Sequence, residues 1–130
     1  MPHANHEMDE PRNPLIIVDD DQWVYVHSSA EDLARAVEPA LLDDIVDAFD
    51  GSARPLRITW AEDSAQVVFA DRAPHLRRLQ EHMDSFFRAW TMNAPPPHAA
   101  TAETYVPPML EAYALRNELR HKSKRPRKTE

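Results

Sequence analysis

The sequence predicts an α+β fold, with a small antiparallel sheet in the order β-β-α-β-β-α and helices packed on one face. Three observations favour it: short β-branched and aromatic runs, a serine-capped stripe of apolar residues, and a long amphipathic segment near residue 80. The chain has 130 residues and is 42% hydrophobic, which suits a single domain with a small core.

Two apolar runs near the N-terminus predict a β-hairpin. Leu15 to Val18 is a short strand, and Trp23 to His27 is the strongest strand signal of the chain. Asp19 to Gln22 between them has turn chemistry. Trp23 and Tyr25 fall on one face, which is either part of the core or a binding platform; the core is the preferred interpretation.

The next segment predicts two helices, at 30–38 and 40–49. Ser28 with Glu31, or Ser29 with Asp32, forms a capping box. Apolar residues then recur every four positions, and Pro39 interrupts the pattern. Gly51 is the expected left-handed cap. The recurring residues are Leu33, Val37, Leu41, Ile45 and Phe49.

A second hairpin and a third helix are expected to complete the domain. Residues 56–60 alternate, with Leu56, Ile58 and Trp60 predicted to point inward, and residues 66–70 form the partner strand. Pro74 suits the first turn of a helix that reaches about residue 91. Its predicted buried face is Leu76, Leu79, Met83, Phe86, Phe87 and Trp90.

The rest of the chain is expected to flank one domain at 15–92. Residues 1–14 are predicted to be a disordered acidic arm. Residues 93–107 are proline-rich and predict a semi-rigid linker, followed by a helix at 108–121 that Pro107 and Pro108 open. Residues 122–130 are predicted to be a basic, disordered tail.

The charge is distributed unevenly. Residues 1–50 hold 13 acidic and 2 basic residues, a net charge of −11, whereas residues 91–130 hold 4 acidic and 7 basic residues, a net charge of +3. Such asymmetry bears on partners and solubility more than on the fold. It favours binding to another charged macromolecule.

An acidic set within the predicted second helix is the candidate partner-binding surface. Asp43, Asp47 and Asp50 would share one helical face, and like charges at this spacing destabilise a helix slightly. Docking to a basic protein, a solvated outer face and metal binding remain open, although no calcium-loop pattern is present. The full set is Glu38, Asp43, Asp44, Asp47 and Asp50.

The basic tail is the second candidate site. Seven of the thirteen residues from Arg116 to Lys128 are Lys or Arg, against one acid. Contact with nucleic acid, attachment to an acidic partner and a solubilising tail that folds back on the acidic half all remain open. The tail residues are Arg120, Lys122, Lys124, Arg125, Arg127 and Lys128.

No set of residues forms a catalytic signature. The chain has no cysteine and one glycine, so it lacks thiolate chemistry and a phosphate-binding loop. Asp19, Asp20 and Asp21 could hold a cation, but a turn is preferred. An acid–base enzyme centred on His27 or His75 is the remaining catalytic alternative. We expect no cofactor and no metal.

A resemblance adds to this interpretation. The strand, the serine-capped acidic helix, Phe49-Asp50-Gly51-Ser52 and Leu56-Arg57-Ile58 resemble small uncharacterised actinobacterial α+β proteins of immunity-protein type, over residues 15–91. The resemblance implies an inhibitor of a toxin.

The sequence therefore predicts a non-enzymatic, cytoplasmic protein-binding module for a basic partner. The alternative is a regulatory or assembly factor that acts through the basic tail. No apolar run approaches the about 20 residues that span a bilayer, so no membrane partner is expected. The oligomeric state stays open.

Overall fold

The computed structural model describes residues 10–90 and 94–123. Most of the predicted arm at 1–14 and of the predicted tail at 122–130 lies outside these residues. The described elements are β1 (Leu15–Asp19), β2 (Val24–His27), α2 (Ala30–Ala36), α3 (Pro39–Leu42), β3 (Ile45–Phe49), β4 (Leu56–Ala61), β5 (Ser64–Phe69), α4 (Leu76–Trp90) and α5 (Ala102–Ser123). The fold is α+β, as predicted.

A three-stranded antiparallel sheet in the order β2-β1-β3 forms the centre of the molecule. The hairpin of β1 and β2 pairs Leu15 with His27 and Val18 with Val24, which confirms the predicted pairing. All five residues of β1 are buried, because this strand is covered on both faces. An uninterrupted apolar run is typical of such a strand.

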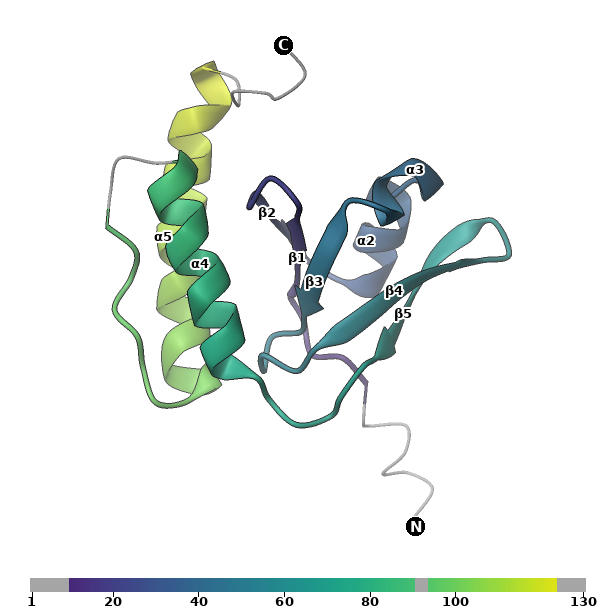
Figure 1. The fold of residues 1–130 in the computed structure, drawn as a ribbon, viewed down its shortest axis with the longest axis horizontal. Coiled ribbons are helices and arrows are strands. Elements are labelled where there is room, and N and C mark those ends of the chain that lie inside the picture. The colour runs from purple at the N-terminus through teal and green to yellow at the C-terminus, as the bar shows by residue number, and fades with distance from the viewer. Residues whose placement is uncertain (1–9, 91–93, 124–130) are drawn as a thin grey trace.

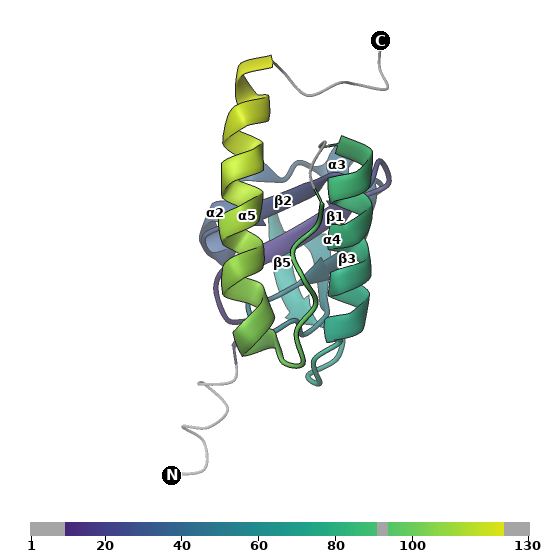
Figure 2. The ribbon, with the colours of Figure 1, turned by 90° about the vertical axis from the view of Figure 1, so that its left-hand side faces the viewer.

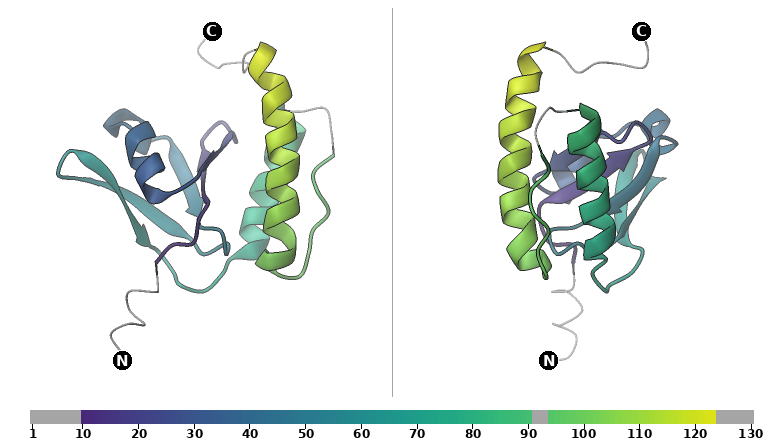
Figure 3. Two further views of the ribbon diagram at one scale, coloured as in Figure 1. Left: turned by 180° about the vertical axis from the view of Figure 1, so that it is seen from behind. Right: turned by 60° about the vertical axis from the view of Figure 1, so that its left-hand side comes forward.

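Helices cover both faces of this sheet (Figures 1 and 3). On one side lie α4 and α5. On the other side lie α2, α3 and a two-stranded hairpin of β4 and β5. The prediction of one sheet with helices on one face is therefore wrong in this detail. Residues of β1 alternate in direction, and both sets are apolar, so each face needs its own cover.

The core is divided between the two faces. The helix-side cluster joins the sheet to α4 and α5. It contains Ile16, Val18, Trp23, Val24, Phe49, Ala53, Leu79, Met83, Phe86, Phe87, Tyr105, Val106 and Met109. The hairpin-side cluster contains Leu15, Ile17, Leu33, Val37, Ala48, Leu56 and Ala65. Trp23 is buried, so the core interpretation of its face holds for this residue.

Several local signals lead to the expected elements. The Oγ of Ser29 accepts a hydrogen bond from the backbone N–H of Asp32 and caps α2, as one of the two predicted capping boxes requires. β4 and β5 pair along their full length. Their turn uses Glu62 and Asp63 with φ of 53° and 67°, the left-handed values that a tight hairpin turn needs. Trp60 is 37% exposed, so its predicted inward position is wrong.

The predicted helix at 40–49 is wrong. Helix α3 ends at Leu42, and residues 45–49 form strand β3, which pairs with β1. The spacing of four between Ile45 and Phe49 is even, so in a regular strand both side chains would lie on one face. A bulge opposite Val18 and Asp19 inserts one extra residue between them, Val46, which is 55% exposed, and so turns them to opposite faces. Ile45 then packs with the hairpin-side cluster and Phe49 with the helix-side cluster.

The last helix begins at Ala102, six residues before the predicted start, so only 94–101 of the described linker lacks regular secondary structure. Thr101 caps the helix, because its Oγ1 accepts a hydrogen bond from the N–H of Thr104. Tyr105 and Val106 are buried in the turn before Pro107 and Pro108. Burial of these side chains offsets the cost of prolines inside a helix.

Gly51 has no positive φ, so the predicted left-handed cap is wrong. The glycine is needed for a close approach instead. A Cβ at this position would lie 2.5 Å from the carbonyl oxygen of Asn13, and the N–H of Gly51 donates to the carbonyl oxygen of Arg12. The segment before β1 is thereby held against the loop after β3.

In the described part of the chain, no helix has both the length and the apolar character required to cross a membrane.

Candidate functional site

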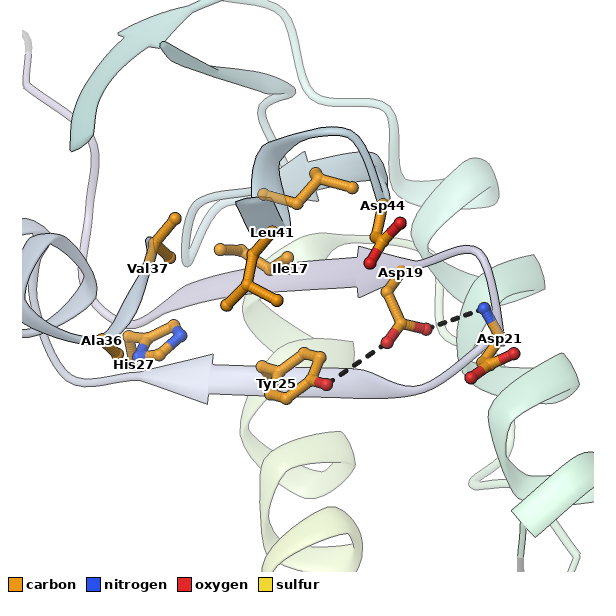
Figure 4. Close-up of a pocket in the computed structure, with 10 residues that line it drawn as sticks. Ile17, Asp19, Asp21, Tyr25, His27, Ala36, Val37, Leu41 and Asp44 are labelled. Atoms are coloured by element: carbon orange, nitrogen blue, oxygen red, sulfur yellow. Dashed lines mark hydrogen bonds between the residues drawn. The ribbon is translucent and has the colours of Figure 1, made fainter. Parts of the chain in front are cut away.

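A pocket of about 190 Å³ lies between the central sheet and the α2–α3 segment (Figure 4). Strands β1 and β2 form its floor, and the end of α2, helix α3 and the start of β3 form its wall. The lining residues are Ile17, Asp19, Asp21, Tyr25, His27, Ala36, Val37, Leu41, Asp44 and Ile45.

Asp19 forms the acidic end of the floor. It is 8% exposed, at the end of β1. Its carboxylate accepts hydrogen bonds from the N–H of Asp21 at 2.9 Å, from the N–H of Trp23 at 3.0 Å and from the hydroxyl of Tyr25 at 3.2 Å. The first two bonds build the turn between the strands. The third fixes the Tyr25 ring along the floor.

Two turns meet at this end of the pocket. The N–H of Asp20 donates to the carbonyl oxygen of Asp44 at 2.9 Å, which joins the β1–β2 turn to the α3–β3 turn. The indole N–H of Trp90 donates to the carbonyl oxygen of Asp21 at 2.9 Å and holds the same turn from the other face. Carboxylates from two distant segments are therefore placed side by side at this end of the pocket (Figure 4).

His27 lies at the opposite end of the pocket. Its side chain is 13% exposed, and Nδ1 lies 3.6 Å from a carboxylate oxygen of Asp32. Burial lowers the pKa of His27, and the charge of Asp32 opposes this shift only in part. The ring is therefore neutral at pH 7 and adds no positive charge to the pocket.

The pocket combines an apolar wall with negative charge at one end. Val37, Leu41 and Ile45 provide aliphatic contact, and Asp19, Asp21 and Asp44 provide the carboxylates. No lysine or arginine is among the residues that line it. Such an arrangement fits a cation that carries an aliphatic stem, as the side chains of lysine and arginine do.

Of the predicted acidic set, three residues lie near the pocket and two do not. Glu38 caps α3 without a side-chain hydrogen bond, and Asp43 follows the same helix; both are exposed. Asp44 lines the pocket. In the residues that the structure describes, the carboxylates of Asp43 and Asp44 have no hydrogen-bond or ion-pair partner.

Asp47 binds within the fold instead. It lies on the face of β3 that is turned toward α4, where Nε and Nη2 of Arg78 donate to its two oxygens at 2.7 and 2.9 Å. His82 Nε2 lies 2.9 Å from the same carboxylate. Burial alone would raise the pKa of Asp47, but the hydrogen bonds from His82 and Arg78 outweigh it and lower the pKa.

Asp50 is also internal, with no exposed surface. Its carboxylate accepts hydrogen bonds from the N–H groups of Arg12, Ser52 and Arg54 and from the Arg54 guanidinium, each at 2.9 Å. A shared helical face of Asp43, Asp47 and Asp50 therefore does not exist. Alternation along β3 and the turn after it send the three carboxylates to different places.

The predicted basic residues lie in and beyond the last helix. Arg120 and Lys122 fall within α5. Lys124, Arg125, Arg127 and Lys128 lie outside the described residues.

Asp19, Asp20 and Asp21 could hold a cation, because one oxygen of each lies within 4.8 Å of the others. Asp19 already accepts three hydrogen bonds, however, and a carboxylate has about four acceptor positions. Hard cations take six or more oxygen ligands. The geometry favours the turn interpretation.

His75, which directly precedes α4, and His82 within α4 belong to an ion-pair network between α4 and β3. His75 Nε2 lies 2.8 Å from Asp71, and Arg78 lies between this pair and Asp47. In the described residues, no hydroxyl group hydrogen-bonds to the ring of His75 or His82. The network joins β3 to α4 and holds no activated nucleophile of the serine type.

The sequence analysis identified several residues that line the pocket, but it did not predict that they form one pocket. It identified Asp44, His27 and the run of three aspartates as separate features. It did not connect them with Tyr25, Val37 or Leu41. The usable signal was Asp19, a charged residue directly after four buried apolar positions of one strand.

Comparisons of the chain with protein-family models, with curated proteins and with solved structures found no match.

Proposed function

We propose that this protein is a non-enzymatic protein-binding module that takes a lysine or arginine side chain of a basic partner into the pocket. The observation that carries the proposal is the gathering of Asp19, Asp21 and Asp44 at one end of an apolar cavity that no described lysine or arginine lines. An inhibitor or immunity factor acting on a basic protein is the role that this binding mode suits.

The chemistry of the pocket matches both parts of such a side chain. The methylene stem can lie along Val37, Leu41 and Ile45. The cationic group then reaches carboxylates that are partly removed from water, where charge-assisted hydrogen bonds are strong. Leu41 is 43% exposed at the rim and extends the apolar contact to the partner's surface.

The surrounding charge favours encounter with such a partner. Residues 1–50 carry a net charge of −11, and Glu38 and Asp43 lie exposed beside the pocket. A negative field of this kind accelerates association with a basic surface, and it weakens as salt is added. The exposed carboxylates thus contribute to the association rate, and the pocket contributes to specificity.

The test is a titration with a short alanine-based peptide that carries one lysine, followed by amide resonances in solution. Resonances of Asp21, Tyr25 and Asp44 should shift with the lysine peptide and not with a norleucine peptide of the same length. Asp44→Asn should weaken binding by about tenfold, or ~1.4 kcal/mol, because one carboxylate is lost from the pocket.

Asp43→Asn is the matched control. It removes the same charge from the neighbouring residue, which is exposed and does not line the pocket. Its affinity for the lysine peptide should stay within about twofold of the unsubstituted protein. Equal losses in the two variants would show an effect of net charge alone and would rule out the pocket as the binding site.

A further inference from the structure

The carboxylates of the pocket supply more negative charge than they supply open acceptor positions. The two oxygens of Asp19 together accept three internal hydrogen bonds, from the N–H groups of Asp21 and Trp23 and from the Tyr25 hydroxyl. A carboxylate has about four acceptor positions, so at most about one remains for a ligand. Asp21 is likewise engaged within the fold. Among the described residues that line the pocket, the carboxylate without an internal partner is that of Asp44.

An unmodified lysine ammonium is a poor match for this balance. It carries three N–H donors and no acceptor. In a half-buried site, a donor that finds no acceptor costs free energy, because it has lost its hydrogen bond to water. A cation with fewer N–H donors keeps the attraction to the carboxylates and avoids this cost.

The rest of the lining suits methyl groups on a cationic nitrogen. The Tyr25 ring lies along the floor, and the side chains of Ile17 and Leu41 border the same space (Figure 4). The hydroxyl of Tyr25 donates to Asp19 and holds the ring in this position. Methylated ammonium groups bind well against aromatic rings, because their charge is attracted to the electrons of the ring. Aliphatic side chains around the methyl groups exclude water.

The backbone fixes Asp44 next to this apolar part of the pocket. Its N–H donates to the carbonyl oxygen of Leu41 at 3.0 Å, and its carbonyl oxygen accepts from the N–H of Asp20 at 2.9 Å. Asp44 and Leu41 both line the pocket from this one turn. A nitrogen with one N–H and two methyl groups can therefore donate to Asp44 while its methyl groups contact Leu41 and the Tyr25 ring.

We infer that the pocket prefers a methylated lysine of the basic partner, and a dimethylated lysine most. The inference rests on the proposed function, because it names the form of the lysine side chain that the same pocket takes. The dimethylammonium group keeps its charge and one donor for Asp44. A trimethylated lysine has no N–H donor and loses the bond to Asp44. A partner that carries the dimethylated side chain binds more tightly than an unmodified one.

The experiment titrates the full-length protein with alanine-based peptides that differ in one side chain: lysine, or its monomethyl, dimethyl or trimethyl form. Amide resonances of Tyr25 and Asp44 report binding. The dimethyl peptide should bind several-fold more tightly than the unmethylated one, up to about tenfold, with the monomethyl peptide between them. The trimethyl peptide should bind less tightly than the dimethyl peptide. A neutral analogue, in which a CH group replaces the N–H of dimethyl-lysine, should bind about tenfold more weakly or worse.

Two substitutions of Tyr25 separate the ring from the hydroxyl. Tyr25→Phe and Tyr25→Leu both remove the bond to Asp19, and only the second removes the ring. The advantage of dimethyl-lysine over lysine should persist in Tyr25→Phe and fall below about twofold in Tyr25→Leu. Because two ligands are compared on one protein, a general loss of stability does not imitate this result.

A second pair of variants tests the hydrogen bond to Asp44. Asp44→Ala removes the acceptor, so the dimethyl and trimethyl peptides should then bind within about twofold of each other. Asp43→Ala removes the same charge from the exposed neighbour that does not line the pocket, and it should leave the order of the peptides unchanged.

The two proposals fail in different ways. Equal or tighter binding of the unmethylated peptide, with its sensitivity to Asp44→Asn intact, overturns the preference for methylated lysine and leaves the proposed function standing. An equal gain from methylation in Tyr25→Phe and Tyr25→Leu overturns it as well, because the ring would then have no part in it. Failure of every cationic peptide to bind overturns the proposed function, and the inference with it.

Discussion

At the scale of single residues, the acidic side chains of this protein divide into those that hold the fold and those that lie at the pocket or in solvent. Asp47 and Asp50 are tied to Arg78, His82 and Arg54. Asp44 is available at the pocket. Sequence spacing alone treats all of them alike, because spacing does not show which carboxylate meets an arginine that lies 31 residues away.

Asp47 should make the free energy of unfolding depend on pH in acid. Its pKa in the folded state is below the ordinary value of 3.8, so the unfolded chain binds the proton more readily. The stabilisation is fully present above about pH 4 and is lost as the pH falls through the lower folded value. Asp47→Asn should cost about 1–2 kcal/mol at pH 7.

Urea unfolding of both proteins between pH 7 and pH 2 measures this effect. The difference between Asp47→Asn and the unsubstituted protein should shrink as the pH drops below about 4. A difference that is constant across the range would mean that the ion pairs of Asp47 do not stabilise the charged form.

Loss of the hydroxyl group should have opposite effects on the free energy of unfolding at Tyr105 and at Tyr25. The hydroxyl of Tyr105 is buried and has no hydrogen-bond partner among the described residues, and burial, with the charge of Asp84, raises its pKa. Tyr105→Phe should leave the free energy of unfolding unchanged or raise it by up to about 1 kcal/mol. Tyr25→Phe removes the bond to Asp19 and should lower it by about 1 kcal/mol.

Thermal unfolding of the two variants at neutral pH provides the measurement. Equal losses of stability would contradict this assignment, because they would require a strong hydrogen bond to the Tyr105 hydroxyl.

At the scale of elements, local signals predicted most of the fold. Ser29 with Asp32 predicted the start of α2, alternating residues predicted β4, and the apolar positions of α4 predicted its buried face. These elements are determined by neighbours in the sequence. The two elements that were predicted wrongly depend on contacts between residues far apart in the sequence. Residues 45–49 form strand β3 because they pair with the edge of β1. Helix α5 begins earlier than predicted because its first turns pack on the sheet in the helix-side cluster.

The candidate site was less predictable than the fold for the same reason. Its lining comes from segments 17–27 and 36–45, which meet through the Asp20–Asp44 hydrogen bond. The sequence shows which carboxylates exist. It does not show that two turns bring them to the end of one cavity.

Packing of α5 can be tested with two apolar residues of the same helix. Met109 is fully buried in the helix-side cluster, whereas Leu115 is 52% exposed. Met109→Ala should lower the free energy of unfolding by about 2–4 kcal/mol, and Leu115→Ala by less than about 1 kcal/mol. Urea unfolding measures both effects. Similar small losses in the two variants would contradict the packing of α5 on the sheet and would favour the tethered helix that the proline-rich linker predicts.

At the scale of the whole molecule, charge and topology act together. The negative half of the chain supplies the central sheet and the pocket. Salt should therefore weaken the proposed encounter with a basic partner.

The parallel pairing of α4 with α5 also bears on how the protein is made. Tyr105, Val106 and Met109 complete a core whose other members precede them in the chain. While the ribosome is still translating these codons, one face of the central sheet has no cover, and residues such as Ile16 and Val24 are open to water. The domain can then fold completely only after α5 has emerged, so a pause in translation just before Thr101 would leave an aggregation-prone nascent chain.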